Sequence, residues 1–255
     1  MPLAISEIAV TERKAASRHF SFSSAFSASS AVLTRSVSSA PLVVLRVAFG
    51  LLMAASMVRF MARGWVTELY VLPQFHFTFW GFDWIRPLPP SGMWLVFSLL
   101  ALLGLTIAAG LATRPSLIAF FLLFTYVELI DKAYYLNHYY FVSLLTFLLI
   151  FLPVQGEWSV DGRIGWRPSQ PSVPTWMLWL VRAQLGLVYF FAGVAKLNPD
   201  WLLAAQPLTI WLHARTSTPL LGPLFDTAWM PYLFSWAGML FDLTVPFWLS
   251  WRKSR

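Results

Sequence analysis

Six long apolar stretches follow one another along this chain of 255 residues, and they constrain its fold more than any other feature. In order, they cover residues 41–61, 93–112, 116–130, 138–152, 175–196 and 231–251. About 20 apolar residues in a helix cross the hydrocarbon core of a bilayer. Composition agrees, because 58% of the residues are hydrophobic and 11% are charged, against about a quarter charged in soluble domains. We predict an all-α fold: a polytopic transmembrane helix bundle of about six spans with interfacial helices.

The first 40 residues differ from the rest. They are rich in Ser and Ala and carry four of the basic residues, Arg13, Lys14, Arg18 and Arg35. Such a composition buries too little apolar surface to fold, so we predict a disordered Ser-rich tail over 1–40 and a transmembrane domain over 41–255. A transit peptide, removed after import, is the alternative.

Charge and composition exclude several classes of function. The net charge is +7, but the basic residues are scattered between apolar runs, which argues against a nucleic-acid partner. The sequence has no Cys, so disulfides, thiolate metal sites and a cysteine nucleophile are excluded. The four His residues show no paired spacing, and we expect no metal site. Phosphate-binding loops and nucleophile elbows are also missing from the sequence.

Basic residues in the links predict how the spans are oriented. With the amino terminus inside, the inner links and termini hold ten Lys and Arg and the outer links hold four. We therefore predict a multi-pass protein of the inner or plasma membrane with both termini cytoplasmic and the lipid bilayer as its main partner. This topology places the turn 131–138 and the end of the fifth span on the same outer face, where they can meet.

One lysine stands out at the end of the fifth span. Lys196 lies in the segment YFFAGVAKLNPDW, after a long and almost uncharged run, and Gly193 before it lets another backbone or a flat ligand approach closely. Burial disfavours a charged amine, so Lys196 can act as a neutral general base. The alternative is a snorkelling lysine that marks the bilayer edge.

A second polar group lies at the end of the third span. Glu128, Asp131, Lys132 and Tyr135 are spaced three, four and seven residues apart, which places them on one helical face. They either line a polar pocket or form a Glu128 to Lys132 ion pair that locks the bundle. His138 follows and is either a catalyst or an interfacial aromatic residue.

Two charges lie within the last two spans. Arg182 and Asp242 are expected to pair with each other, because unpaired charges in hydrocarbon are costly. Arg182 is about 21 Å along a helix from Lys196, so we interpret it as structural. The residues around 201–215, WLLAAQPLTIWLHAR, predict an interfacial amphipathic helix.

An amine, an imidazole, tyrosines and many aromatic side chains near one membrane face suit deprotonation of a flat, lipid-soluble, weakly acidic molecule such as a quinol. Four ordered segments sharpen this idea: RPLPPSGMWLVF, DKAYYLNHYY, EWSVDG and YFFAGVAKLNPDW. They resemble segments of the vitamin K-dependent gamma-glutamyl carboxylase family, whose shared part is the horizontally transferred transmembrane domain. The resemblance covers roughly residues 45–249.

The resemblance implies a lyase-type reaction of a quinol. In the family a lysine removes a proton from vitamin K hydroquinone, oxygen adds, and the resulting strong base deprotonates a glutamyl side chain that carbon dioxide then traps. By this resemblance Lys196 is the base, and His138 with Asn137 binds or polarises the quinol. Tyr135, Tyr189 and Gly193 complete the expected quinol-binding set.

This chain departs from the family pattern in two places. It has Ala195 and Lys196 where the animal carboxylase has two lysines, and the resemblance ends before the later membrane segments and the lumenal domain. We therefore expect a short, bacterial-type member that epoxidises vitamin K hydroquinone or a related quinol, with a glutamyl protein as a further substrate. The alternative is a non-catalytic transmembrane scaffold or a lipid- or quinone-binding module.

Overall fold

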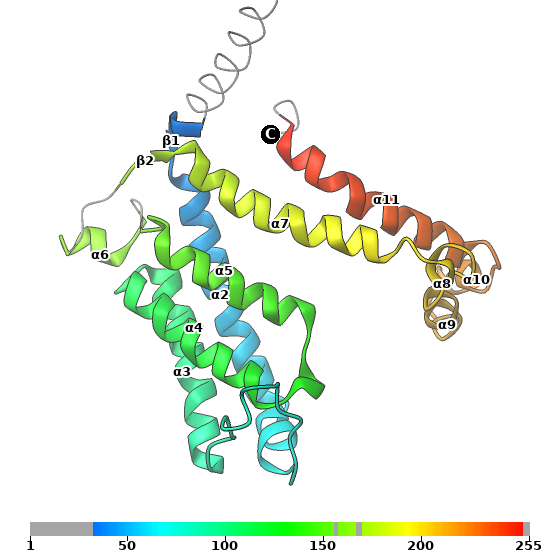
Figure 1. The fold of residues 1–255 in the computed structure, drawn as a ribbon, viewed down its shortest axis with the longest axis horizontal. Helices are drawn as coiled ribbons and strands as arrows, with labels where there is room; N and C mark the ends of the chain where they lie inside the picture. The colour runs from blue at the N-terminus through cyan, green and yellow to red at the C-terminus, as the bar shows by residue number, and fades with distance from the viewer. Residues whose placement is uncertain (1–32, 156–157, 167–169, 252–255) are drawn as a thin grey trace, which may run out of the picture. The chain divides into compact units, whose positions relative to one another are not determined.

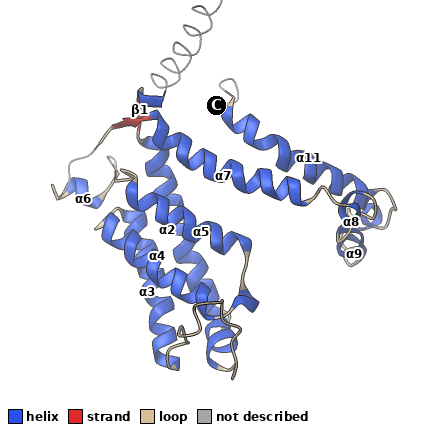
Figure 2. Ribbon diagram, in the orientation of Figure 1, coloured by secondary structure: helices blue, strands red, loops and turns tan. Residues whose placement is uncertain are grey.

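The computed structural model describes residues 33–155, 158–166 and 170–251. They are almost entirely helical (Figure 2), so the predicted all-α class is confirmed. The chain forms two compact units, which divide between Leu178 and Trp179, and each is described by itself. The first 32 residues of the predicted tail lie outside the described residues, whereas Ser36–Ser38 form strand β1.

Four helices form the body of the first unit (Figure 1). They are α2 (Ala40–Ala62), α3 (Pro90–Ala109), α4 (Thr113–Ile130) and α5 (Asn137–Phe151). A five-residue π-helix, η1 (Thr67–Val71), follows α2, and a 3-10 turn, η2 (Lys132–Tyr134), joins α4 to α5. Consecutive helices pack against each other and run in opposite directions.

Small residues let α2 and α3 approach closely. A Cβ added to Gly50 would lie 2.5 Å from the backbone nitrogen of Ala108, and one added to Gly104 would lie 2.8 Å from the backbone nitrogen of Ala54. Both helices therefore carry small residues four positions apart at their contact, the spacing that allows membrane helices to pack backbone to backbone. Phe49 and Phe120 extend this packing to α4, with ring centroids 5.8 Å apart.

A polar cluster closes one end of this bundle around α6 (Val160–Arg163). The Asp161 carboxylate accepts hydrogen bonds from the backbone N–H groups of Ala112 and Thr113, at 2.7 and 3.1 Å, and so caps the start of α4. Arg46 of α2 is fully buried beside it and donates to the Trp158 carbonyl. The charge that lies inside the first span is thus held by protein groups.

The fourth of the six predicted spans corresponds to a shorter helix than the other five. Among the described residues, five helices are long and apolar enough to span a membrane, and α5, with 15 residues, is shorter. After α5 the chain continues through buried Leu152 and Val154 to α6, which lies beside the start of α4. The segment from α5 to α6 therefore runs from one end of the bundle to the other. Strand β2 (Ser172–Pro174) then pairs antiparallel with β1.

The second unit contains two long helices joined by short ones. They are α7 (Thr175–Ala195), whose first turn belongs to the first unit, α8 (Pro199–Leu202), α9 (Leu208–His213), α10 (Gly222–Phe225) and α11 (Met230–Ser250). The prediction of one interfacial helix over 201–215 is wrong. Pro207 lies between α8 and α9, and a proline cannot donate the backbone hydrogen bond that a continuous helix needs.

Candidate functional site

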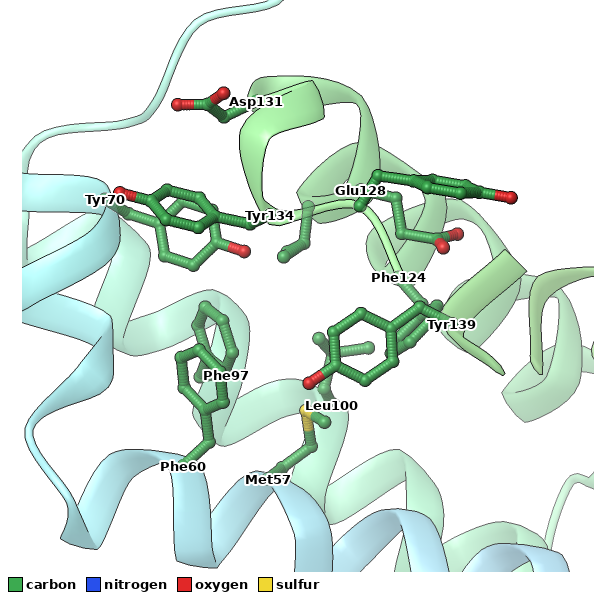
Figure 3. Close-up of a pocket in the computed structure, with 12 residues that line it drawn as sticks. Met57, Phe60, Tyr70, Phe97, Leu100, Phe124, Glu128, Asp131, Tyr134 and Tyr139 are labelled. Carbon is green, nitrogen blue, oxygen red and sulfur yellow. The ribbon is translucent and has the colours of Figure 1, made fainter. Parts of the chain in front are cut away.

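An aromatic pocket lies in the first unit (Figure 3). It is lined by Met57, Phe60, Tyr70, Phe97, Leu100, Phe124, Val127, Glu128, Asp131, Tyr134, Tyr135 and Tyr139. Its cavity volume is about 30 Å³. A six-membered ring therefore enters only when side chains at the mouth move.

The ends of the membrane helices position this pocket. Phe60 near the end of α2 stacks on Phe97 of α3, with centroids 4.8 Å apart and planes 12° apart. Tyr70 of η1 packs at 5.7 Å from Phe97 and at 6.1 Å from Tyr134 of η2. Because these rings belong to four different elements, the pocket forms only when the bundle is assembled.

Its polar groups are phenols and the two carboxylates of Glu128 and Asp131. Tyr70 is buried, and this burial raises the pKa of its phenol above the ordinary value, so Tyr70 stays protonated at neutral pH. Glu128 projects from α4 and accepts a hydrogen bond from the Ser143 hydroxyl of α5. The pocket thus presents hydroxyl groups and carboxylates among aromatic faces, a combination suited to a ring that carries hydroxyl groups.

The predicted shared helical face at the end of the third span is wrong in detail. Helix α4 ends at Ile130, and Asp131 has an extended backbone with φ of −148°. Glu128, Asp131 and Tyr135 still line the pocket together, but the Lys132 side chain is exposed and its backbone N–H donates to the Phe77 carbonyl at 2.8 Å. Of the two alternatives for this group, the pocket is present, and Glu128 accepts from Ser143 instead of pairing with Lys132.

Other predicted residues of this turn lie beside the pocket. Tyr135 is half-exposed at its mouth. Asn137 and His138 are exposed in the first turn of α5, and the His138 ring packs edge-on at 4.6 Å against Tyr139, which does line the pocket. These two side chains could therefore touch a ligand in the pocket only if the turn moved; otherwise they would act on it through Tyr139.

The sequence analysis missed one buried pair, His76 with Asp131. The imidazole Nδ1 lies 3.1 Å from the Asp131 Oδ2, and both residues are buried, with 7% and 5% of their surface exposed. The other carboxylate oxygen accepts from the backbone N–H groups of Phe77 and Ala133. His76 stands in an aromatic loop, QFHFTFW, where the sequence shows no sign that it contacts a residue 55 positions away.

Lys196, in the second unit, is surrounded by electron-rich groups. Its Nζ lies 2.5 Å from the Asp242 Oδ2 of α11 and 3.2 Å from the Ala192 carbonyl. The same Nζ is 5.2 Å from the centre of the Trp201 ring, within range of a cation–π contact. Asp242 therefore pairs with Lys196, whereas the Arg182 guanidinium, its expected partner, lies 5.5 Å from the centre of the Trp179 ring.

Gly193 and Tyr189 serve the contact between α7 and α11. A Cβ on Gly193 would lie 2.7 Å from the Leu243 side chain, so the space that the glycine leaves is filled by a neighbouring helix. Tyr189 packs edge-on against Phe241 at 6.0 Å. Of the two uses that the sequence allowed for Gly193, the structure displays the approach of another backbone.

Comparison with known protein families decides the relationship. The family model of the HTTM domain matches residues 34–255. The chain belongs to the HTTM domain family. This is the domain of the vitamin K-dependent carboxylase family, so the resemblance seen in the four sequence segments is confirmed. No solved structure matches the chain.

In this HTTM domain the predicted site residues therefore fall into two groups. Tyr135 lines the aromatic pocket of the first unit, with Asn137 and His138 beside it. Lys196, Gly193 and Tyr189 belong to the second unit, where Asp242 and Leu243 are their partners. A hydroxylated ring has its best-matched residues in the first group, and the candidate amine base is in the second.

Proposed function

We propose that this HTTM domain is a membrane enzyme that binds a quinol in the aromatic pocket and removes its protons so that it can react with oxygen. The observation that carries the proposal is the pocket itself, which combines stacked rings, the buried Tyr70 phenol and the Glu128 carboxylate at one end of apolar helices. A lipid-soluble quinol has matching chemistry, because its ring is flat and apolar and its two hydroxyl groups donate and accept hydrogen bonds.

Binding requires a small opening of the pocket. Tyr135 is half-exposed at the mouth, and its ring is 6.4 Å from the Tyr140 ring on the first turn of α5. Rotation of Tyr135 makes room for a ring without breaking the packed contact of Phe60 with Phe97. Side-chain rearrangement of this size is common when ligands and partners bind.

The family resemblance assigns the role of base to Lys196, which belongs to the second unit. Its ammonium is paired with Asp242, so it must lose a proton before it can accept one from a quinol. Transfer of that proton to the carboxylate of Asp242 leaves a neutral amine beside a neutral acid, with no net change of charge. In this step Asp242 accepts the proton of Lys196 and so makes the amine basic. The family resemblance extends the proposal to glutamyl carboxylation with oxygen and carbon dioxide as co-substrates.

The deciding experiment is oxygen-dependent epoxidation of vitamin K hydroquinone by the purified protein in lipid. Replacing Lys196 with Ala should lower the rate by about 100-fold or more, the contribution typical of a positioned base. Lys132→Ala is the matched control, because Lys132 is an exposed lysine next to the pocket turn. Equal epoxidation by the Lys196→Ala and unaltered proteins would exclude Lys196 as the base.

A non-catalytic scaffold is the second candidate, and the Lys196 to Asp242 ion pair favours it. Such a pair between α7 and α11 fits a lysine whose work is to hold two helices together. A scaffold predicts that Lys196→Ala lowers thermal stability while the unaltered protein forms no epoxide. If the protein is an enzyme, the unaltered protein forms epoxide, and Lys196→Ala loses this activity while most of its thermal stability remains.

The proposed orientation places both termini in the cytoplasm and the pocket at the outer face of an inner or plasma membrane. The chain has no Cys, so labelling of a single introduced cysteine shows on which side of the membrane that position lies. Arg63 and Arg163 lie at opposite ends of the four-helix unit, after α2 and in α6. Impermeant maleimide added to intact cells should label Arg63→Cys and spare Arg163→Cys; the reverse pattern would invert the topology.

A further inference from the structure

The loop between η1 and α3, residues 72–89, exposes aromatic side chains and pairs several of its polar ones with protein groups (Figure 1). The Thr78 hydroxyl donates to the Asp83 carboxylate within the loop. The His76 ring lies 3.1 Å from the Asp131 carboxylate of the turn after α4. More than a third of the surface is exposed in five aromatic residues, Phe75, Phe77, Trp80, Phe82 and Trp84. A loop that faces water normally shows the reverse, and an exposed apolar patch of this kind marks an interface with a protein or a membrane.

A fixed turn forms the tip of this loop. The Phe82 N–H donates to the Phe79 carbonyl at 3.0 Å, and Gly81 has a φ of 82°, which glycine adopts without strain. The turn presents Trp80 with 97% of its surface exposed, and Trp84 follows with 76%. The exposed tryptophans are therefore carried by a hydrogen-bonded stretch of backbone.

Hydrogen bonds fix the loop at the level where α4 ends. The Phe77 N–H donates to the Asp131 carboxylate at 3.2 Å, and the Phe77 carbonyl accepts from the Lys132 N–H at 2.8 Å. Helix α4 is long and apolar enough to span a membrane, and its last residue is Ile130. The loop thus lies at the end of a membrane-length helix, where the hydrocarbon core of a bilayer gives way to lipid headgroups.

The end of α2 carries groups that suit the same level of a bilayer. The guanidinium carbons of Arg59 and Arg63 lie 5.6 and 5.4 Å from the centre of the Trp65 ring, and both arginines are exposed. Rings of α2 and η2 both pack against Tyr70, so these groups lie at the same end of the bundle as the loop. Arginine near the end of a span extends its charge toward the headgroups, and tryptophan is enriched at that level.

We propose that residues 72–89 insert into the interfacial layer of the bilayer, with Trp80 and Trp84 among the lipid headgroups. Lipid is the fitting partner because it surrounds apolar helices at this level, and because an indole presents an apolar ring and an N–H donor at one boundary. The pairing of Thr78 with Asp83 lowers the cost of removing these groups from water. Asp131 also lines the aromatic pocket, so the inserted loop fixes one wall of that pocket at headgroup level. This placement does not depend on the quinol function.

Spin labelling of single cysteines tests the placement, since the chain has no Cys of its own. A nitroxide is attached to Trp80→Cys or Trp84→Cys, whose side chains are so exposed that their replacement removes little packing. Lys132→Cys is the matched control, because Lys132 is an exposed polar residue at the same end of the bundle. Leu102→Cys, exposed in the middle of α3, gives the value for a lipid-facing position.

Each labelled protein is placed in phosphatidylcholine vesicles at a low protein-to-lipid ratio. Collisions of the nitroxide with oxygen and with a water-soluble nickel chelate are then measured. Oxygen is apolar and concentrates in the bilayer, whereas the chelate stays in water. We expect Trp80→Cys and Trp84→Cys to show a several-fold higher ratio of oxygen to nickel collisions than Lys132→Cys, closer to the ratio of Leu102→Cys.

Two outcomes would overturn the proposal. Nickel collisions as frequent at Trp80→Cys and Trp84→Cys as at Lys132→Cys would show that the loop lies in water. Infrequent collisions with both reagents would show that protein covers the loop, either a second copy or another part of this chain.

Discussion

The two units solve the problem of polar groups in apolar helices differently. In the first unit, about two fifths of the most apolar 18-residue segment of α2, α3 and α4 is buried. The charged side chains of Arg46 and Asp161 form hydrogen bonds with backbone groups at one end of the bundle. In the second unit, only 6% and 11% of the corresponding segments of α7 and α11 are buried. Two helices can cover only one face of each other, so this unit depends on a few specific contacts, above all the Lys196 to Asp242 pair. The first unit thus encloses a pocket, whereas the second is held together by one charge pair.

The largest effect should come from breaking the close contact of α2 with α3. A leucine at Gly104 would push into the backbone of Ala54, and overpacking of this kind costs roughly 3 kcal/mol or more where backbone must move. Gly238→Leu in α11 is the control, because a Cβ there meets nothing within 4 Å. Thermal unfolding in detergent should show a large loss for Gly104→Leu and little change for Gly238→Leu. Equal stability of the two variants would refute the contact.

The ion pair of the second unit should give the next effect. Asp242→Leu leaves Lys196 without its carboxylate and should lower the free energy of unfolding by about 2–3 kcal/mol, as for a lost hydrogen bond to a charged group. The double variant Lys196→Met with Asp242→Leu should recover most of that loss, because no charge is then left unpaired. Additive losses in denaturant or thermal unfolding would show that the two side chains act independently.

The cap of α4 tests the polar end of the first unit on a smaller scale. Asp161→Ala removes the acceptor for two backbone N–H groups and should destabilise the protein by about 1–2 kcal/mol. Asp83→Ala is a fair comparison, since Asp83 is an exposed carboxylate that accepts from the Thr78 hydroxyl. If hydrogen exchange at the start of α4 were equally slow in both variants, Asp161 would not be the cap.

The smallest effect concerns Tyr70 in the wall of the aromatic pocket. Tyr70→Phe keeps the ring contacts with Phe60 and Phe97 and removes only the hydroxyl, so stability should change by less than about 1 kcal/mol. Because burial raises the pKa of Tyr70, its phenol stays protonated up to alkaline pH, and no loss of stability from its ionisation should appear below about pH 10, the ordinary tyrosine pKa. A melting temperature that falls between pH 7 and 9 in the unaltered protein but not in Tyr70→Phe would contradict this.

Local sequence signals predicted some parts of the candidate site and failed for others. Tyr135 was found because the polar cluster after the third span is conspicuous in an apolar chain, and it does line the pocket. Asp242 was predicted to pair with Arg182 instead of Lys196, because the residue of α7 that lies beside Asp242 depends on how α7 and α11 cross at Gly193. His76 was passed over because its loop shows an aromatic pattern typical of a membrane interface.

The sequence by itself determined the helical membrane class, the family and the order of the four long helices of the first unit. Hydrophobic length and turn residues are local properties, so they can be read along the chain. Only the tertiary structure decided which side chains meet: His76 with Asp131, Lys196 with Asp242, and Gly50 with the backbone of α3. Such contacts depend on the rotation and crossing of packed helices, to which residues far apart in the sequence contribute together.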